Sequence, residues 1–125
     1  RLARAGTRGC QGSPVSINAR AFYTLSLDVQ PIFMGTCAGC HFNGGTLPNV
    51  ATNAATTYAQ TVGVGSVCAP GQVRVVPGSP TTSLLMLRLD NTSASCPTPM
   101  PPAGILNAQT RAIVRAWIGH GALND

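Results

Sequence analysis

Cys37-Ala38-Gly39-Cys40-His41 is the stretch that decides the fold of this 125-residue chain, because it reads C-x-x-C-H. That spacing is the attachment signature of a c-type haem. Each cysteine adds to one vinyl group of the haem, and two intervening residues on a helical turn set the sulfurs at the matching separation. The adjacent histidine supplies the proximal nitrogen to the iron. The motif therefore predicts one covalently attached haem c, held by Cys37, Cys40 and His41.

Two other uses of a C-x-x-C pair are a zinc site and a redox-active dithiol. Zinc requires a second metal-binding pair at compatible spacing, whereas the remaining cysteines, Cys10, Cys68 and Cys96, stand alone. A thioredoxin-like dithiol follows a strand in a βαβ pattern, whereas residues 25–34, just before the motif, have a helical pattern. The sequence therefore favours haem over both alternatives.

Charged residues make up only 9% of the chain, against a usual share of about 25%. The chain has no lysine and no glutamate, and its formal net charge is +5. Because it has no basic run with interleaved aromatic residues, nucleic-acid binding has no support. Two interpretations explain the low charge equally well. Other subunits cover part of the surface, or a GC-rich genome encodes a chain rich in Ala, Gly, Pro, Thr and Arg.

Five cysteines in so short a chain indicate an oxidising compartment, periplasmic or otherwise extracytoplasmic. Haem attachment uses two of them, so Cys68 and Cys96 are the expected disulfide. Cys10 is left over as a free or intermolecularly bonded thiol; lipidation is the alternative, although the residues before it do not resemble a lipobox. No stretch has the length of a membrane span and no signal peptide is visible, so we expect a leader lost before this numbering begins, or an anchor outside it.

Residues 1–23 lack periodicity and are expected to form an N-terminal arm, followed by one domain over residues 24–125. The first helix of that domain leads into the motif, with Asp28 as its cap and Pro31 in its first turn. The other expected elements are a short helix over residues 53–62, an extended segment over 73–76, a helix capped by Ser79 with Pro80 at its first position, an irregular proline-rich segment over 91–104, and a last helix capped by Asn107 and ended by Gly119 and Gly121.

Four pieces of the chain stand in an order that points to a family. They are residues 29–33 with the motif, then Pro77-Gly78-Ser79-Pro80 with Ser83-Leu84, then Cys96-Pro97-Thr98-Pro99-Met100-Pro101-Pro102, and finally Ile113, Trp117-Ile118 and Gly121-Ala122. This arrangement resembles a class I-type monohaem cytochrome c, and especially the bacterial domains with a long insertion between the haem motif and the distal methionine.

The resemblance covers residues 24–123 and implies an all-α fold. That fold is a small cytochrome c-like helical domain with long loops around one covalently bound haem. The first and last helices would cross, and a haem edge would be exposed for electron transfer. The chain departs from the family pattern in its arginine-bearing arm, its lack of lysine and its Cys68/Cys96 pair, and without lysines a docking ring of that residue type is not expected.

The axial ligand opposite His41 is predicted to be Met100. Flanking prolines hold it in an irregular segment that can project a thioether at the iron, and methionine opposite histidine raises the reduction potential. The alternatives are Met34, Met86 and His120. Met34 is too near the proximal side. Met86 is on an apolar helical face, where a core filler is the default, and His120 is at a helix end, where a surface position is the default.

Several other side chains have two possible roles each. Tyr58 and Trp117 either line the haem or are packed aromatics of the core. Arg74 and Arg88 either pair with the haem propionates or are solvated. Pro48 and Asn49 are expected to shape the proximal side, where the histidine's other nitrogen usually donates to a carbonyl. The sequence alone does not choose that carbonyl.

The predicted function is one-electron transfer outside the cytoplasm by a His/Met-ligated c-type haem, without catalysis by the chain itself. The expected partners are a redox donor and a redox acceptor. Two forms stay open, a diffusible carrier and a bound subunit of a larger membrane-associated respiratory or photosynthetic assembly, and the low charge and the arm favour the second.

The alternative is a peroxidase-like haem enzyme or sensor with an open distal site, which needs a vacant iron position and a distal acid–base group. A third class is a haem that serves only to hold a small binding domain together.

Overall fold

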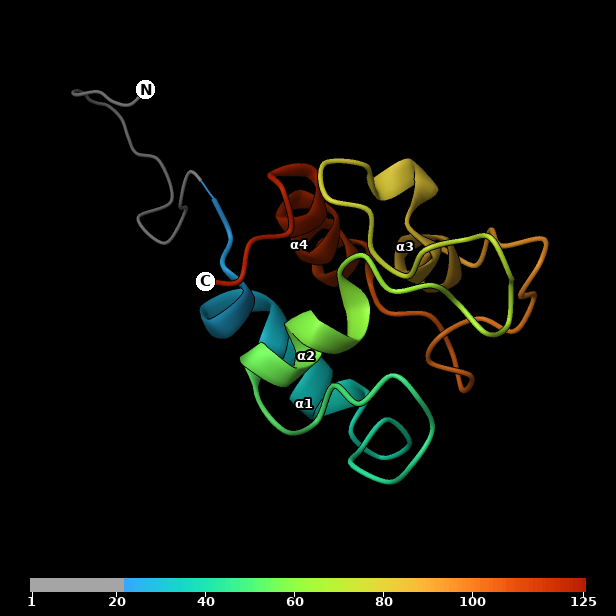
Figure 1. The fold of residues 1–125 in the computed structure, drawn as a ribbon, viewed down its shortest axis with the longest axis horizontal. Helices are drawn as coiled ribbons and strands as arrows, with labels where there is room; N and C mark the ends of the chain where they lie inside the picture. The colour runs from blue at the N-terminus through green and yellow to red at the C-terminus, as the bar shows by residue number, and fades with distance from the viewer. Residues whose placement is uncertain (1–21) are drawn as a thin grey trace.

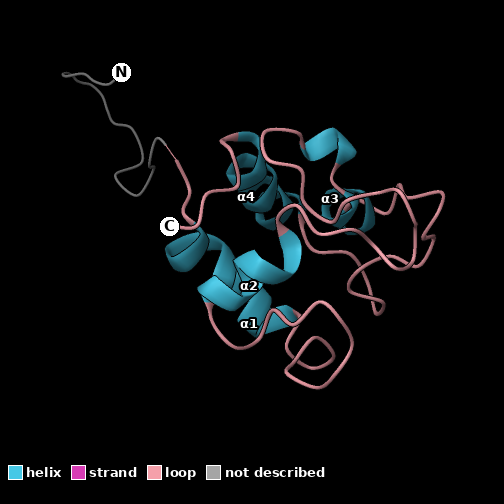
Figure 2. Cartoon of the chain, in the orientation of Figure 1, coloured by secondary structure: helices cyan, strands magenta, loops and turns pink. Residues whose placement is uncertain are grey.

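The computed structural model describes residues 22–125, so Cys10 and nearly all of the predicted N-terminal arm lie outside the described residues. Figures 1 and 2 show helices joined by long loops, and residues 22–125 contain no strand beyond isolated bridges. The described part is all-α, as the sequence predicts. None of its helices combines the length and the apolar character needed to cross a membrane. The helical segments are η1 (Leu25–Val29, a π-helix), α1 (Gln30–Thr36), α2 (Ala54–Thr61), η2 (Pro80–Thr82, a 3₁₀-helix), α3 (Leu84–Leu89) and α4 (Ala108–Gly119).

The helix before the motif begins at Leu25 and runs through η1 into α1. Thr24 is its N-cap, because the Thr24 hydroxyl accepts a hydrogen bond from the Leu27 N–H at 3.1 Å. The predicted cap at Asp28 is wrong. Asp28 lies inside the first turn, where its carboxylate accepts from the Thr24 N–H at 2.8 Å, in the manner of a capping box. Pro31 falls in the first turn of α1, although the helical segment as a whole begins earlier, at Leu25.

The cap predicted for the last helix is confirmed, and a second asparagine caps α2 in the same way. The Asn53 side chain accepts from the N–H of Thr56 at 2.8 Å at the start of α2. The Asn107 side chain accepts from the N–H of Thr110 at 2.8 Å at the start of α4. In both cases a side-chain oxygen satisfies an N–H that the first helical turn leaves without a partner, which fixes where the helix begins.

The single helix predicted after Ser79 is divided into η2 and α3 in the structure. Ser83 separates them, with an extended backbone that forms a bridge to Val73. The buried Ser83 hydroxyl donates to the Ser79 carbonyl at 2.8 Å and accepts from the Val76 N–H at 2.8 Å. These contacts of Ser83 with Val73 and Val76 interrupt the helix. Both partners lie in the segment that the sequence predicts to be extended.

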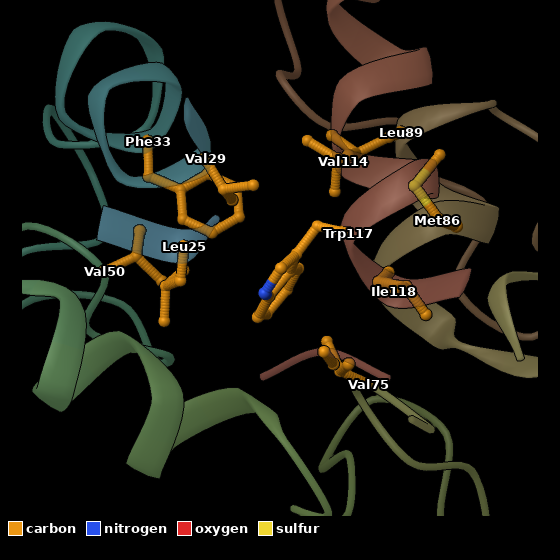
Figure 3. Close-up of a cluster of buried hydrophobic side chains, with 11 residues drawn as sticks. Leu25, Val29, Phe33, Val50, Val75, Met86, Leu89, Val114, Trp117 and Ile118 are labelled. Atoms are coloured by element: carbon orange, nitrogen blue, oxygen red, sulfur yellow. The ribbon is translucent and has the colours of Figure 1, made fainter. Parts of the chain in front are cut away.

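The core joins the two ends of the described chain, because η1 packs against α4, and α4 packs against α3 and η2. Figure 3 shows Leu25, Val29 and Phe33 on one side of Trp117, with Val114 and Ile118 beside it on α4. The Trp117 indole is only 1% exposed, and its N–H donates to the Leu123 carbonyl at 3.0 Å. Its apolar area is therefore buried without an unpaired donor. The buried cluster is Leu25, Val29, Phe33, Val50, Val75, Met86, Leu89, Val114, Trp117, Ile118 and Ala122.

A disulfide joins Cys68 to Cys96, the pair that the sequence predicts, with their Cα atoms 6.0 Å apart. Cys96 is buried with Ala69 and Leu84 in a second, smaller apolar cluster. The hydroxyl of Ser93 accepts from the Cys96 N–H at 3.0 Å and holds the turn on that side. The bridge ties the start of the proline-rich segment after α3 to the loop that follows α2.

An ion-pair network links the end of α3 to α4. Asp90, the C-cap of α3, accepts from the guanidinium of Arg111 at 2.8 Å and from that of Arg115 at 2.7 Å. Burial alone would raise the pKa of the Asp90 carboxyl, but the hydrogen bonds and charges of Arg115 and Arg111 bring it below its usual value. The folded state therefore favours the ionised form of Asp90.

We expect the Asp90→Asn variant to lower the free energy of unfolding at neutral pH by about 1 kcal/mol, since the network is partly exposed to solvent. The folded-state pKa is the lower one, so the stabilisation is complete above the unfolded-state pKa of about 3.9 and is lost as the pH falls through the folded-state value. Urea unfolding of both proteins along a pH series measures this. A stability difference that stays constant into strong acid would contradict it.

Candidate functional site

The C-x-x-C-H motif forms the turn that ends α1. Cys37 is the C-cap, and its N–H donates to the Phe33 carbonyl at 2.9 Å. The Cys37 carbonyl then accepts from the N–H of Cys40 at 3.2 Å and from that of His41 at 2.9 Å. The two thiols and the imidazole are therefore gathered within one turn. Both thiols are free, with Cys37 half-buried and Cys40 exposed.

The His41 ring is held by the loop that follows it. Its Nδ1 lies 3.0 Å from the Pro48 carbonyl and 3.1 Å from the Thr46 carbonyl. Because both neighbours are acceptors, Nδ1 is the donor in these contacts, and in the neutral ring the lone pair is then on Nε2. No hydrogen bond in residues 22–125 engages Nε2. Metal-ligating histidines commonly donate their other ring nitrogen to a backbone carbonyl. The structure shows which carbonyls contact His41, which the sequence could not.

Gly45 sets the shape of that loop. The N–H of Thr46 donates to the Cys40 carbonyl at 2.9 Å, which folds the loop back onto the motif. A Cβ atom at Gly45 would lie 2.7 Å from the same Cys40 carbonyl oxygen and 2.8 Å from the Phe42 ring. Only a residue without a side chain allows the backbone to approach the motif this closely.

The Gly45→Ala variant is therefore expected to displace the loop and the carbonyls that hold His41. We expect a loss of about 1–3 kcal/mol in the free energy of unfolding, the usual cost of forcing extra volume into a packed site. The matched control is Gly35→Ala in α1, where a Cβ would meet nothing within 4 Å. Chemical denaturation of the two variants compares them, and equal stabilities would show that the loop has room at Gly45.

The Cys37 thiol lacks the lowered pKa of a reactive cysteine. Burial raises the pKa of the Cys37 thiol, and its contact with the Thr36 hydroxyl at 3.5 Å offsets this only in part. A reactive C-x-x-C cysteine needs a lowered pKa. Within residues 22–125, no group of three or more His, Cys, Asp or Glu side chains is placed to hold a metal ion.

Met100 lies in the proline-rich loop after α3 and is partly buried. Its side chain packs against the main core cluster, and Cys37 packs against the same cluster. In the view of Figure 1, the orange loop that carries Met100 and the teal loop that carries the motif lie on the side away from the C-terminus. No hydrogen bond joins the two loops in the described part of the chain. The two loops are therefore connected through the buried core, against which Met100 and Cys37 both pack.

The other candidates for the sixth ligand occupy different environments. Met86 is 1% exposed inside the core, as predicted for a core filler, whereas Met34 is 46% exposed on α1. His120 is exposed at the C-cap of α4, and its ring packs edge-to-face on Phe22 with the centroids 4.3 Å apart. Met100 alone among the three methionines combines a loop position with contact to the core.

The two arginines proposed as propionate partners bind backbone carbonyls. Arg74 donates to the Gln60 carbonyl at 2.7 Å, and burial lowers the pKa of its guanidinium. Arg88 donates to the Thr98 carbonyl through Nε at 3.1 Å and Nη2 at 2.9 Å. These carbonyl contacts use only some of the five N–H donors of each guanidinium, so the pairing with propionates stays a prediction. Sequence reasoning missed the carbonyl contacts, because an arginine gives no signal of which carbonyl it will reach.

Sequence reasoning also missed how the charge is distributed. Residues 29–73 contain no Asp, Glu, Lys or Arg, and they include α1, the motif loop and α2. Around the motif, Met34, Phe42 and Leu47 are exposed apolar side chains. This segment therefore contributes no fixed charge of its own beside the motif.

Comparison of the chain with family models, curated proteins and solved structures gives no match. The chemistry available therefore follows from the groups themselves. Two free thiols two residues apart, an imidazole with its Nε2 lone pair available, and a thioether beside the same core are the donor set that fits a covalently bound haem.

Proposed function

We propose that this protein transfers single electrons through one covalently attached haem c. The observation that carries the proposal is the His41 ring, which two carbonyls hold with Nε2 available, in the same turn as two free thiols. Cys37 and Cys40 would form the thioether bonds, His41 would ligate the iron, and Met100 would be the sixth ligand. The bound haem supplies an iron that gains and loses one electron.

The rest of the site acts by tuning and holding these ligands. The carbonyls of Pro48 and Thr46 fix the imidazole and make its free nitrogen a stronger donor. The Met100 thioether is soft and neutral, which favours the reduced iron and raises the potential. Cys37 and Met100 both pack against one buried cluster, so the same core would support the attachment turn and the proposed sixth ligand.

The proposed partners are a redox protein that donates the electron and one that accepts it. The protein acts either as a carrier or as a subunit of a larger membrane-associated assembly. The disulfide pair and the covalent haem favour an extracytoplasmic location. Because residues 29–73 are uncharged, we propose that the partner meets an apolar face, and that electron exchange there changes little with ionic strength.

Voltammetry of the haem-loaded full chain tests this function. The proposal predicts one reversible one-electron wave at relatively high potential, with no catalytic current when hydrogen peroxide is added. A large catalytic current with peroxide would instead favour a haem enzyme with an open distal site. Absence of any reversible wave from a protein that contains haem would leave only a structural role for the group and would overturn electron transfer.

A further inference from the structure

We infer that Arg88 is a positioning residue that holds the Met100 loop in place, so that the thioether is presented as a ligand. The inference rests on the proposed function, because it concerns the sixth ligand of that site. Arg88 lies on α3 and contacts the loop in two ways. Its side chain donates to the Thr98 carbonyl at 3.1 and 2.9 Å, and its own carbonyl accepts from the Met100 N–H at 3.2 Å. One residue thus fixes both ends of the segment from Thr98 to Met100.

The loop has few other means of being held. Residues 97–102 contain four prolines, which have no N–H, so Thr98 and Met100 supply the only backbone donors of this segment. The Met100 N–H is already used by Arg88. The disulfide at Cys96 anchors the segment where it begins, and Arg88 anchors it where the methionine stands.

The charge of Arg88 is directed at the loop alone. The nearest acid in sequence, Asp90, is engaged by Arg111 and Arg115, and no ion pair in residues 22–125 includes Arg88. A planar guanidinium that donates twice to one carbonyl gives a charge-assisted contact with a defined direction. Such a contact restrains the loop more than a neutral hydrogen bond does.

The chain offers a matched control for this contact. Arg74 also donates its guanidinium to a single backbone carbonyl, that of Gln60 at 2.7 Å, at the end of α2. Both arginines are half-buried. Removing either one deletes the same chemical group and leaves a backbone carbonyl without its donor, but only Arg88 is linked to Met100.

The test uses the haem-loaded full chain and its Arg88→Ala, Arg88→Lys and Arg74→Ala variants. The first readout is the near-infrared methionine-to-iron band during heating. The second is the rate at which chloramine-T oxidises Met100, followed by peptide mapping, with the exposed Met34 as the internal reference. We expect Arg88→Ala to lose the band at a lower temperature than Arg74→Ala does. We also expect Met100 to oxidise about tenfold faster in Arg88→Ala than in Arg74→Ala. Arg88→Lys should restore part of both, because it keeps the charge and one donor.

If Arg88→Ala matches Arg74→Ala in both readouts, the inference is overturned. If the wild-type protein lacks the band, Met100 is not the ligand and that part of the proposed function fails, while the oxidation rates still decide whether Arg88 restrains the loop. Should Arg88→Ala fail to fold, Arg88→Lys and Arg74→Lys are compared in the same two measurements, and equal behaviour of that pair again overturns the inference.

Discussion

Replacing Met100 with alanine is expected to abolish the near-infrared methionine-to-iron band of the haem-loaded protein, lower its reduction potential and let cyanide or carbon monoxide bind readily. The thioether favours ferrous iron and fills the sixth position, so its loss acts on all three properties at once. Axial ligands set haem potentials over about 0.8 V, so we expect a shift on the order of 0.1 V or more. Optical spectroscopy, voltammetry and ligand titration measure the three effects.

Met34→Ala is the control for that result. It deletes the same thioether from an exposed position on α1, and it should leave the band, the potential and ligand binding unchanged. A Met100→Ala protein that keeps the band would show that another residue is the ligand, and His120 would be the first to test. An effect of Met34→Ala as large as that of Met100→Ala would contradict the assignment directly.

Trp117→Ala is expected to cost about 3–5 kcal/mol of the free energy of unfolding, as large aromatic deletions in a core do. Trp117 lies on α4, which packs against η1, and it is almost completely buried, so its loss weakens the contact between the first and last helical segments of the described chain. Small domains are stable by only about 5–15 kcal/mol in total. Chemical denaturation followed by the helical circular-dichroism signal should therefore show a much earlier transition.

Two further variants serve as controls for Trp117→Ala. Trp117→Phe keeps much of the apolar volume and loses the hydrogen bond to the Leu123 carbonyl, so it should retain a large part of the stability. Val67→Ala changes a side chain that is 82% exposed, and it should change the free energy of unfolding by no more than about 0.5 kcal/mol. A Trp117→Ala protein as stable as Val67→Ala would show that this core does not hold the helices together.

Local sequence signals predicted the helix starts that depend on hydrogen bonds between residues close together in the sequence. Asn53 and Asn107 each satisfy an N–H three residues later, so the starts of α2 and α4 follow from short stretches. The start of the first helix was misplaced because Thr24 and Asp28 are both capping residues four positions apart, and their mutual hydrogen bond decides between them. Met86 was placed correctly in the core from its position on an apolar helical face.

Sequence patterns did not predict the contacts between residues that are far apart along the chain. The break at Ser83 arises because its backbone pairs with Val73, a tertiary contact that overrides helix propensity. The carbonyls that hold His41 belong to a loop whose path depends on the close approach at Gly45. The C-x-x-C-H spacing predicts which residues bear the chemistry, whereas the backbone groups that orient them emerge only from the fold.

The mass of the purified chain is the most direct test of the central claim, which is covalent attachment of one haem through Cys37 and Cys40. The full chain is produced in a host that attaches c-type haem, denatured and extracted with acid and organic solvent, then weighed by mass spectrometry beside its Cys37→Ala/Cys40→Ala variant. The prediction is the chain mass plus one haem for the wild type and the bare chain mass for the variant. Haem that extracts freely from the wild type, or a wild-type protein at its bare chain mass, would contradict the account.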